Sequence, residues 1–328
     1  MKQLRLAVIG RGRFARYFLE AAKQVPELRY VGQYSRCLTD AQSFAAEYGG
    51  TLVWDDLEAL ARDDGVDAVY VASPNALHCE QSVTLLQAGK HVLCEKPVAS
   101  NSREWGRMCA AADTAGVVLL EAMRSVHCPG FALLQALLPR LGAIRQADLC
   151  FCQYSSRYDN FKAGIVENAF RPELSNGSLM DLGVYCVYMM VALFGVPLSL
   201  TAAAMTLPGS IDGAGSVLAR YDDKVVTLLH SKINDGRGSA ILGEKGMLEM
   251  DSISHPSRFT LTWRDGTVER VAADQVENDM EYEIRRFIRL IHQGGGEQYR
   301  RWSTETMAIL DEIRRQTGIR FPADEEVL

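Results

Sequence analysis

Two glycines that follow an apolar stretch are the first residues with a recognisable chemical use. The stretch Leu4–Ile9 runs into the sequence Gly10-Arg11-Gly12-Arg13-Phe14-Ala15. Between a strand and a helix, Gly10 would allow a tight turn and Gly12 would let the backbone approach a pyrophosphate. The start of the following helix offers free amide groups and a partial positive charge to phosphate. The run therefore predicts a dinucleotide-binding turn that includes Arg13 and Phe14.

The end of the next apolar stretch, Leu28–Tyr34, is where such a turn usually distinguishes its cofactors. Proteins that bind NAD place an acidic side chain there to hold the ribose hydroxyl groups. This chain has Ser35 and Arg36 instead. No carboxylate would repel a 2′-phosphate, and a guanidinium can pair with one. NADP is the predicted cofactor and NAD the alternative; a solvent-exposed Arg36 without a ligand is the competing interpretation.

Polar side chains follow two further apolar stretches, where strands are expected to end. Ligands of parallel sheets bind outside the carboxyl ends of the strands. The residues in question are Ser73, Asn75 and His78 after one stretch, and Glu95 and Lys96 after the next. All five are predicted to contact the dinucleotide, whereas Lys96 taken alone would also suit a surface position.

Asp181 and Tyr185 stand four residues apart at the start of a long apolar segment. In a helix over 177–194 they would project from one face. A carboxylate on an apolar helix is unfavourable unless it is paired. The two residues therefore indicate a second site, against the alternative that Tyr185 is a core aromatic residue whose hydroxyl is hydrogen-bonded.

These residues need a scaffold, and the first 120 residues alternate strand and helix patterns. Strands are predicted at 4–9, 28–34, 67–72, 91–94 and 117–120, and helices at 14–25, 39–48, from Asp55, 78–88 and from Asn101. Such alternation gives right-handed crossovers and a parallel sheet. We expect a doubly wound α/β Rossmann domain over residues 1–122.

After residue 122 the pattern changes to successive strands. They are predicted at 146–154, 199–206, 216–221, 225–231, 237–242, 246–250 and 259–263. Tight turns at Asp222-Asp223 and Asp265-Gly266 predict antiparallel neighbours. Residues 123–328 are therefore expected to form an α+β domain with a large, mainly antiparallel sheet. A helix from Met280 should bury its apolar stripe and leave its charged face, which includes Glu283, in solvent.

Composition limits the possible partners. The 328 residues carry 35 Lys and Arg against 41 Asp and Glu, a net charge of −6. This balance disfavours nucleic acids and anionic membranes. Glycine and proline interrupt the uncharged segment 182–211, which predicts a core helix followed by a strand rather than a membrane span. The opening residues show no export signal, so a cytoplasmic location is expected.

None of the eight cysteines belongs to a Cys-x-x-Cys pair. They are expected to be structural thiols in a reducing compartment, and no metal site is predicted. Cys150 and Cys152 would share one face of a strand.

The motifs together resemble the glucose–fructose oxidoreductase, inositol dehydrogenase and rhizopine-catabolism (Gfo/Idh/MocA) family. The matching pieces are the Gly10–Ala15 turn, Ser73-Pro74-Asn75 with His78, Glu95-Lys96-Pro97, and 177–185. The resemblance implies a Rossmann domain joined to an open-faced α+β substrate domain, with dimers or tetramers formed through that sheet. It also implies that the helix carrying Tyr185 enters the active site. Having Tyr rather than His there is more similar to glucose–fructose oxidoreductases and dihydrodiol dehydrogenases than to inositol dehydrogenases.

Hydride transfer to or from a hydroxyl group requires a side chain that exchanges a proton with the substrate oxygen. We predict that Tyr185 takes this proton, that Lys96 is the nearby cation that stabilises its phenolate, and that Asp181 orients one of these groups. The alternative makes Lys96 the proton carrier, and the sequence leaves both open.

One segment departs from the family pattern. Many relatives have Arg shortly before His-Pro, whereas here Arg124 comes earlier and Val126 stands at that place. Substrate contacts are therefore carried over only as expectations. The four polar side chains expected to bind a hydroxylated substrate, each against a surface role, are Arg124, Arg157, Tyr158 and Asn168.

The predicted substrate is a small polyhydroxylated molecule, such as a sugar, a sugar derivative or a cyclic diol. Two alternatives remain at this point: a cofactor-binding regulator or sensor on the same fold, and a biliverdin-reductase-like enzyme. A pure sensor would have no reason to keep Lys96, Asp181 and Tyr185 together.

Overall fold

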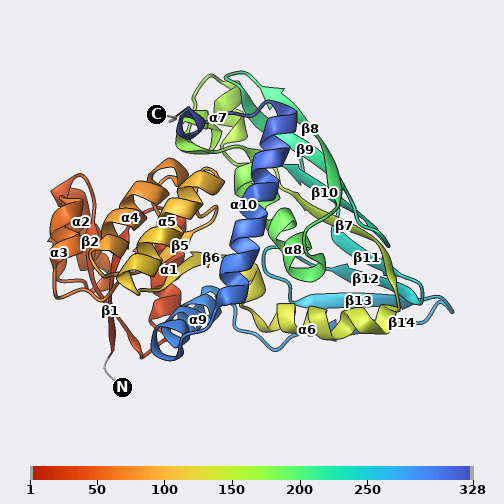
Figure 1. Ribbon diagram of the computed structural model, residues 1–328, viewed down its shortest axis with the longest axis horizontal. Coiled ribbons are helices and arrows are strands. Elements are labelled where there is room, and N and C mark those ends of the chain that lie inside the picture. The colour runs from red at the N-terminus through yellow and green to blue at the C-terminus, as the bar shows by residue number, and fades with distance from the viewer. Residues whose placement is uncertain (1–2, 326–328) are drawn as a thin grey trace. The chain divides into compact units, whose positions relative to one another are not determined.

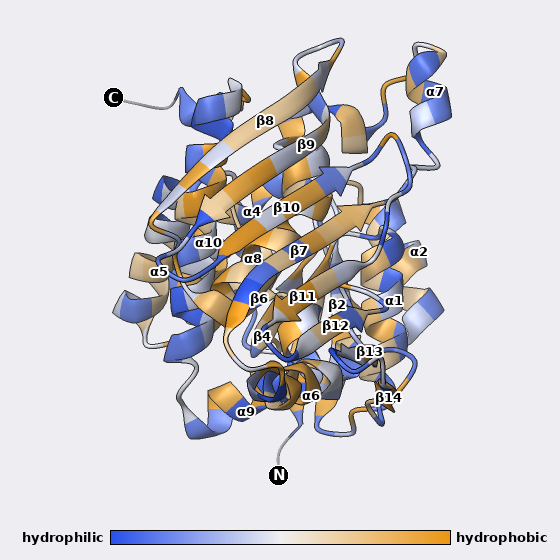
Figure 2. Ribbon diagram, turned by 90° about the vertical axis from the view of Figure 1, so that its right-hand side faces the viewer, coloured by the Kyte–Doolittle hydropathy of each residue, from blue (hydrophilic) through white to orange (hydrophobic). Residues whose placement is uncertain are grey.

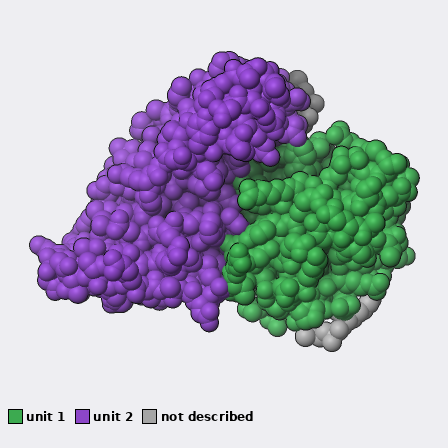
Figure 3. Space-filling view, turned by 180° about the vertical axis from the view of Figure 1, so that it is seen from behind, with its two compact units in different colours: residues 1–123, 276–301 green, residues 124–275, 302–328 purple. Residues whose placement is uncertain are grey.

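A computed structural model describes residues 3–325. The chain divides into two compact units, shown in different colours in Figure 3. The first unit comprises residues up to 123 together with 276–301, and the second comprises 124–275 and the residues from 302 onward. Each unit is described here by itself.

The first unit is built on a parallel sheet. Within residues 3–123 its strands are β1 Leu4–Ile9, β2 Leu28–Tyr34, β3 Leu52–Trp54, β4 Ala68–Val71, β5 His91–Glu95 and β6 Leu119–Ala122, in the spatial order β3-β2-β1-β4-β5-β6. The helical segments between them are α1 Arg13–Ala22, α2 Leu38–Tyr48, α3 Leu57–Arg62, η1 Asn75–Leu77, α4 His78–Gln87 and α5 Ser102–Ala115 (Figure 1). This strand order is that of a doubly wound dinucleotide-binding sheet, so the predicted Rossmann fold is confirmed.

Local sequence explains most of these elements. Strand β4 is fully buried along its length, as its uninterrupted apolar residues predict for an interior strand. Asn101 caps α5 by accepting a hydrogen bond from the Glu104 amide at 3.0 Å. Two details differ from expectation: β3 was not predicted, and the cap of α3 is Asp56 rather than Asp55. The three-residue strand is too short to show a period.

The segment 276–301 belongs to the first unit, although the sequence placed it in the second domain. It carries α9, Met280–Gln293, which contacts α1, and the first residues of α10, Glu297–Thr317. The apolar stripe of α9 is buried as predicted, but Glu283 is also completely buried rather than solvated. The prediction was wrong because the surrounding residues cover a larger part of the circumference of α9 than its apolar stripe occupies.

The second unit contains a large sheet. Over the described residues from 124 onward its strands are β7 Ile144–Cys152, β8 Ser199–Leu207, β9 Ile211–Arg220, β10 Val225–Ser231, β11 Ser239–Gly243, β12 Gly246–Met250, β13 Arg258–Trp263 and β14 Val268–Ala272. Their spatial order is β14-β13-β12-β11-β7-β10-β9-β8. The β7–β10 pair is parallel and the other pairs are antiparallel, so the predicted mainly antiparallel sheet is confirmed, with β14 as an additional strand.

Helices of this unit cover one face of the sheet. The helical segments are η2 Arg124–Val126, α6 Pro129–Leu137, η3 Leu138–Leu141, α7 Tyr158–Lys162, η4 Asn168–Phe170, η5 Pro172–Leu174, η6 Leu179–Gly183, α8 Val184–Phe194 and η7 Pro322–Asp324. Helix α8 contacts β7 and β10. On β10, Val226, Leu228 and His230 are buried toward this inner face, as the period of two requires.

The other face of the sheet is open. Figure 2 looks onto it, with β8, β9, β10 and β7 facing the viewer and apolar residues along them in orange. Met205, Leu218 and Val225 on this outer face are 55%, 53% and 39% exposed. They lie on three neighbouring strands, β8, β9 and β10.

The helical stretch Pro172–Phe194 is long and apolar enough to cross a membrane. However, 78% of its most apolar window is buried inside the structure. The predicted core helix followed by a strand is therefore confirmed, with β8 as the strand. The segment differs from prediction in one respect, because η6 is a turn of π-helix that precedes the α-helical residues.

Candidate active site

The glycine turn of the first unit has the backbone that a dinucleotide requires. Gly10 has φ +100°, and a Cβ there would lie 2.2 Å from the carbonyl oxygen of Ala72, so only glycine fits. A Cβ on Gly12, by contrast, would meet no atom within 4 Å. Gly12 precedes α1 and has no side chain that could cap the amides of the first helical turn. The turn thus fits a pyrophosphate.

The side chains around this turn are exposed. Arg13 and Phe14 begin α1 and are accessible to solvent. Arg11 forms an ion pair with Asp40 at 2.5 Å, which links the turn to α2. After β2, Ser35 is half-buried and Arg36 exposed, at the carboxyl end of the strand where they were expected. These positions leave the residues available to a ligand.

His78 occupies a different place from the one predicted. Its side chain is completely buried, with Nδ1 2.9 Å from the carbonyl oxygen of Pro97 and Nε2 2.9 Å from that of Ser73. Burial lowers the pKa of His78, so its imidazole is neutral and only one of the two nitrogens donates. The ring fastens the loop after β4 to the loop after β5 and is enclosed, so direct contact with a cofactor is not supported.

The other residues of the loop after β4 are more accessible. Ser73 and Asn75 are half-buried, and the Ser73 hydroxyl donates to Gln81 Oε1 at 2.7 Å. Both remain predicted cofactor contacts. Sequence spacing could not separate them from His78, because burial depends on how two loops meet.

Glu95 is the last residue of β5 and Lys96 follows it, and both are buried. Glu95 accepts hydrogen bonds from the Tyr70 hydroxyl and, at 3.2 Å, from the Lys96 amide. Burial raises the pKa of Tyr70 well above its ordinary value, so the phenol is the donor of that pair. The Lys96 ammonium lies 5.7 Å from the centre of the Phe14 ring. The structure therefore brings Lys96 next to the start of α1 and the glycine turn.

In the second unit, Asp181 and Tyr185 follow one another along the helical segment of η6 and α8. Asp181 lies within the π-helical turn, a geometry that often marks functional sites. Its carboxylate is 32% exposed and pairs with the Lys232 ammonium at 3.0 Å. Tyr185 is buried, and its ring packs edge-on against Phe151 of β7 at 5.5 Å. The carboxylate is thus paired, as an acidic residue in this segment must be.

Sequence reasoning missed Lys232. The residue directly follows β10, and its side chain is almost completely buried. Besides Asp181, its ammonium donates to the Ala169 carbonyl at 2.8 Å and lies 5.0 Å from the centre of the Phe170 ring. Its position directly after an apolar strand was the one signal in the sequence that could have indicated a buried lysine. Its partners Asp181 and Ala169 are about 50 and 60 residues away along the chain, so spacing does not connect them.

Two more buried polar residues support the π-helical turn. Asp212 is inaccessible, and its Oδ2 accepts a hydrogen bond from the Leu179 amide at 2.6 Å. His230 lies 4.0 Å from the same oxygen, with its Nδ1 2.9 Å from the Ser178 hydroxyl. Burial raises the pKa of Asp212 to about 6 and lowers that of His230 to about 4. The contacts of Asp212 with the Leu179 amide and of His230 with the Ser178 hydroxyl hold the π-helical turn in place.

The four expected substrate ligands are scattered over the second unit. Tyr158 packs against Phe161 and Phe170, and Asn168 begins η4. Both are therefore near the segment that holds Lys232. Arg157 is exposed and pairs with Glu167 at 3.2 Å, and Arg124 lies 3.4 Å from Nδ1 of His255. Their roles stay predictions.

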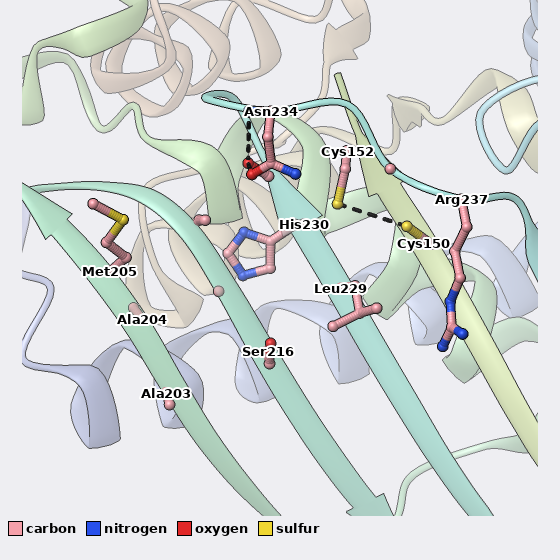
Figure 4. A pocket seen from close by; sticks show the side chains of 14 residues that line it. Cys150, Cys152, Ala203, Ala204, Met205, Ser216, Leu229, His230, Asn234 and Arg237 are labelled. Carbon is pink, nitrogen blue, oxygen red and sulfur yellow. Dashed lines mark hydrogen bonds between the residues drawn. The ribbon is translucent and has the colours of Figure 1, made fainter. Parts of the chain in front are cut away.

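A hollow of about 450 Å³ lies on the outer face of the sheet (Figure 4). Cys150 and Cys152 line it on the same face of β7, as predicted, with their sulfur atoms 3.6 Å apart. Over residues 3–325, the His, Cys, Asp and Glu side chains form no group of three that could hold a metal ion.

The parallel sheet with its glycine turn and strand-end lysine, and the mainly antiparallel second unit, define a two-unit nicotinamide-dependent oxidoreductase fold. Residues 4–123 match an oxidoreductase family with an NAD-binding Rossmann fold, GFO/IDH/MocA, and residues 139–249 match the GFO/IDH/MocA C-terminal domain. The chain belongs to this family, as its motifs predicted.

Individual relatives refine this assignment. The chain is 43% identical to scyllo-inositol 2-dehydrogenase (NADP(+)) IolU of Bacillus subtilis (strain 168), over 98% of this chain and 99% of that one. It is 27% identical to the trans-1,2-dihydrobenzene-1,2-diol dehydrogenase of Mus musculus, with the same coverage. The chain is therefore similar to both kinds of enzyme, and of these two relatives the inositol dehydrogenase has the higher identity, which differs from the expected order of similarity.

Solved structures confirm the fold. KijD10, a 3-ketoreductase from Actinomadura kijaniata in complex with NADP and TDP-benzene, superimposes with a TM-score of 0.87 at 23% identity. The match covers 98% of this chain and 99% of that chain.

Proposed function

We propose that the chain is an NADP-dependent dehydrogenase or reductase that acts on a CH–OH group of a small polyhydroxylated substrate. The observation that carries the proposal is the Asp181–Lys232 ion pair in the π-helical turn that leads to Tyr185. A partly exposed carboxylate in this otherwise apolar segment is unfavourable unless it is paired, so its presence there favours a role in binding or catalysis. Family membership and the relatives' activities support the same function.

The glycine turn and its neighbours bind the cofactor. The amides after Gly12 hold the pyrophosphate, and Ser35 and Arg36 hold the 2′-phosphate. NADP, when bound, supplies or accepts a hydride at its nicotinamide. Lys96, directly after β5, is a charged side chain at the ligand-binding edge of the sheet.

Tyr185 exchanges the proton of the substrate oxygen. Its phenol has a reference pKa of about 10, so a cation is needed to stabilise the phenolate near neutral pH. Lys96 provides this cation in our assignment. Asp181 orients one of the reacting groups, which we take to be the substrate hydroxyl. Lys96 as the proton carrier is the rival assignment.

A cyclic polyol is the first substrate to test, because the relative with 43% identity is a scyllo-inositol 2-dehydrogenase. The sensor alternative is disfavoured, since Lys96, Asp181 and Tyr185 are all retained. A biliverdin-reductase-like enzyme is the other alternative, and would show no turnover with small polyols.

The functional protein is a homo-oligomer in the cytoplasm, either a dimer or a tetramer. Met205, Leu218 and Val225 on the open face of the sheet are the apolar residues that a second copy would cover.

The function is tested by a turnover screen of the purified protein with NADP. The panel contains inositols, other polyols, aldoses and trans-diols, and nicotinamide reduction is followed with wild type and with Lys96→Ala. Turnover of one class that disappears in the variant supports an enzyme of that substrate class. Retained NADP binding with no turnover across the panel would contradict the proposal in favour of a sensor or of a larger substrate.

Arg36→Ala is expected to weaken NADP binding about 10- to 100-fold and to leave NAD binding unchanged. A hydrogen bond to a charged group contributes about 1.5–3 kcal/mol, and only NADP has the 2′-phosphate. The two dissociation constants are measured by calorimetry. Arg29→Ala is the control, because Arg29 is an exposed arginine on the same strand, remote from its carboxyl end. Equal loss of NAD affinity would contradict a phosphate contact.

A further inference from the structure

Position 232 is unusual for a lysine because it is buried. Its side chain is 2% exposed, and a buried ammonium is strongly unfavourable unless it is paired and hydrogen-bonded. An ammonium has three donor directions. One points to the Asp181 carboxylate at 3.0 Å and another to the Ala169 carbonyl at 2.8 Å. The structure thus surrounds the cation with acceptors.

The contacts tie three segments of the second unit together. Lys232 follows β10, Asp181 lies in η6, and Ala169 lies in η4. Ala169 and Phe170 are themselves part of a small apolar cluster with Leu207 and Ile211. The lysine therefore has little freedom to move, and neither has the carboxylate oxygen that it holds.

Other charged groups face the same region. Asp212 is fully buried beneath η6, and the Lys232 ammonium is among the influences that lower its pKa. Burial has the larger effect and raises the pKa of Asp212 to about 6. His230 adjoins Asp212 and is neutral, since burial lowers its pKa to about 4. Asp181 is the acid in direct contact with the ammonium, and it is also the more exposed of the two acids.

We propose that Lys232 is a positioning residue that keeps Asp181 ionised and fixes its orientation toward the substrate hydroxyl. A cation about 3 Å from a carboxylate favours the charged form and fixes one of its oxygens. Asp181, at 32% exposure, is the member of the pair that a substrate can reach, whereas Lys232 is enclosed. The inference rests on the proposed function, because it takes Asp181 to act on the substrate.

The test uses Lys232→Met, which keeps most of the side-chain volume and removes the charge. We expect kcat to fall at least 10-fold, the NADP dissociation constant to stay within 2-fold, and the acid limb of the kcat/KM profile to move upward by about one pH unit, as loss of a nearby opposite charge implies. Lys224→Met is the control, since Lys224 also pairs with an aspartate and contacts aromatic rings, but at the surface turn before β10. A variant with wild-type kcat and acid limb overturns the proposal.

Two further variants keep the proposal falsifiable if Lys232→Met does not fold. Lys232→Arg retains the charge and is expected to retain the wild-type acid limb even where kcat falls; a shifted limb overturns the proposal. Asp181→Asn completes a double-mutant cycle. If Lys232 acts through Asp181, removing Lys232 from the Asp181→Asn protein causes no further loss of kcat; a full additional loss overturns it.

The same cycle separates this inference from the proposed function. If wild type turns over no substrate of the panel, the proposed function fails, and the four proteins are compared by urea unfolding at pH 3 and pH 8. A carboxylate that a cation keeps charged takes up its proton only below its ordinary pKa of about 4, so coupling between Lys232 and Asp181 at pH 8 that weakens at pH 3 supports the ionised pair. Equal coupling at both values, or none, overturns it whatever the activity.

Discussion

Replacing Tyr185 with phenylalanine is expected to lower kcat about 100- to 10,000-fold, the range that general acid–base groups contribute. The substitution removes only the hydroxyl group. The ring still packs against Phe151, so the free energy of unfolding should fall by no more than about 1.5 kcal/mol, the contribution of one hydrogen bond, and the NADP dissociation constant should change little. Steady-state kinetics with the best substrate of the panel, together with calorimetric NADP titration, measure both quantities.

Tyr188→Phe is the matched control for this experiment. Tyr188 is equally buried on α8 and packs edge-on against Trp302 at 6.3 Å. Its hydroxyl has no role in our assignment, so kcat should stay near that of wild type. If Tyr185→Phe retains nearly full turnover while Lys96→Ala loses it, Lys96 rather than Tyr185 carries the proton.

The second prediction concerns Asp212 and His230, whose contributions to pH-dependent stability should cancel in the wild type. Between about pH 4 and pH 6 folded Asp212 holds a proton that the unfolded chain has released, so its contribution falls as the pH rises. Between about pH 4 and pH 6.5 folded His230 lacks a proton that the unfolded chain holds, so its contribution rises with pH. Each slope is about 1.4 kcal/mol per pH unit, and the signs are opposite.

Single substitutions should expose each slope. For His230→Asn, the free energy of unfolding relative to wild type is expected to decrease as the pH rises from 4 to 6, by about 3 kcal/mol in total. For Asp212→Asn it is expected to increase over the same range by a similar amount. Asparagine keeps an acceptor for the Leu179 amide in the second case.

Urea unfolding at half-unit pH steps provides the measurement, and differences from wild type remove the contribution of all other groups. The double variant with both substitutions lacks both contributions, so its free energy of unfolding relative to wild type should not change with pH. If the free energy of unfolding of both single variants has the same pH dependence as that of wild type, neither group titrates as its burial implies.

Regular elements could be predicted from the sequence because their causes are local. Strands β1, β2 and β10 have the bounds that their apolar stretches indicated. The glycine turn was also predictable, since φ +100° and the approach to Ala72 admit no other residue at position 10. The helix start at Asn101 followed from one side chain and one amide.

The parts that could not be predicted depend on residues distant in the chain. Whether His78 meets a ligand or two carbonyl groups is decided by how two loops pack. The role of Lys232 depends on its contacts with Asp181 and the Ala169 carbonyl. Glu283 is buried because of the segments that cover α9. Polar residues in the interior are governed by such long-range pairings, for which a single sequence carries no periodic signal.

The placement of 276–301 in the first unit has a consequence for recombinant work. Asn278 donates to the Tyr17 carbonyl at 2.8 Å, Arg285 to the Gln24 carbonyl at 3.0 Å, and Arg300 forms a two-pronged ion pair with Asp113. A fragment that ends at residue 123 loses all three attachments and leaves the face of α1 that α9 covers open to water. Exchanging cofactor specificity by grafting this unit between relatives therefore requires two pieces of chain, with the second cut made inside α10.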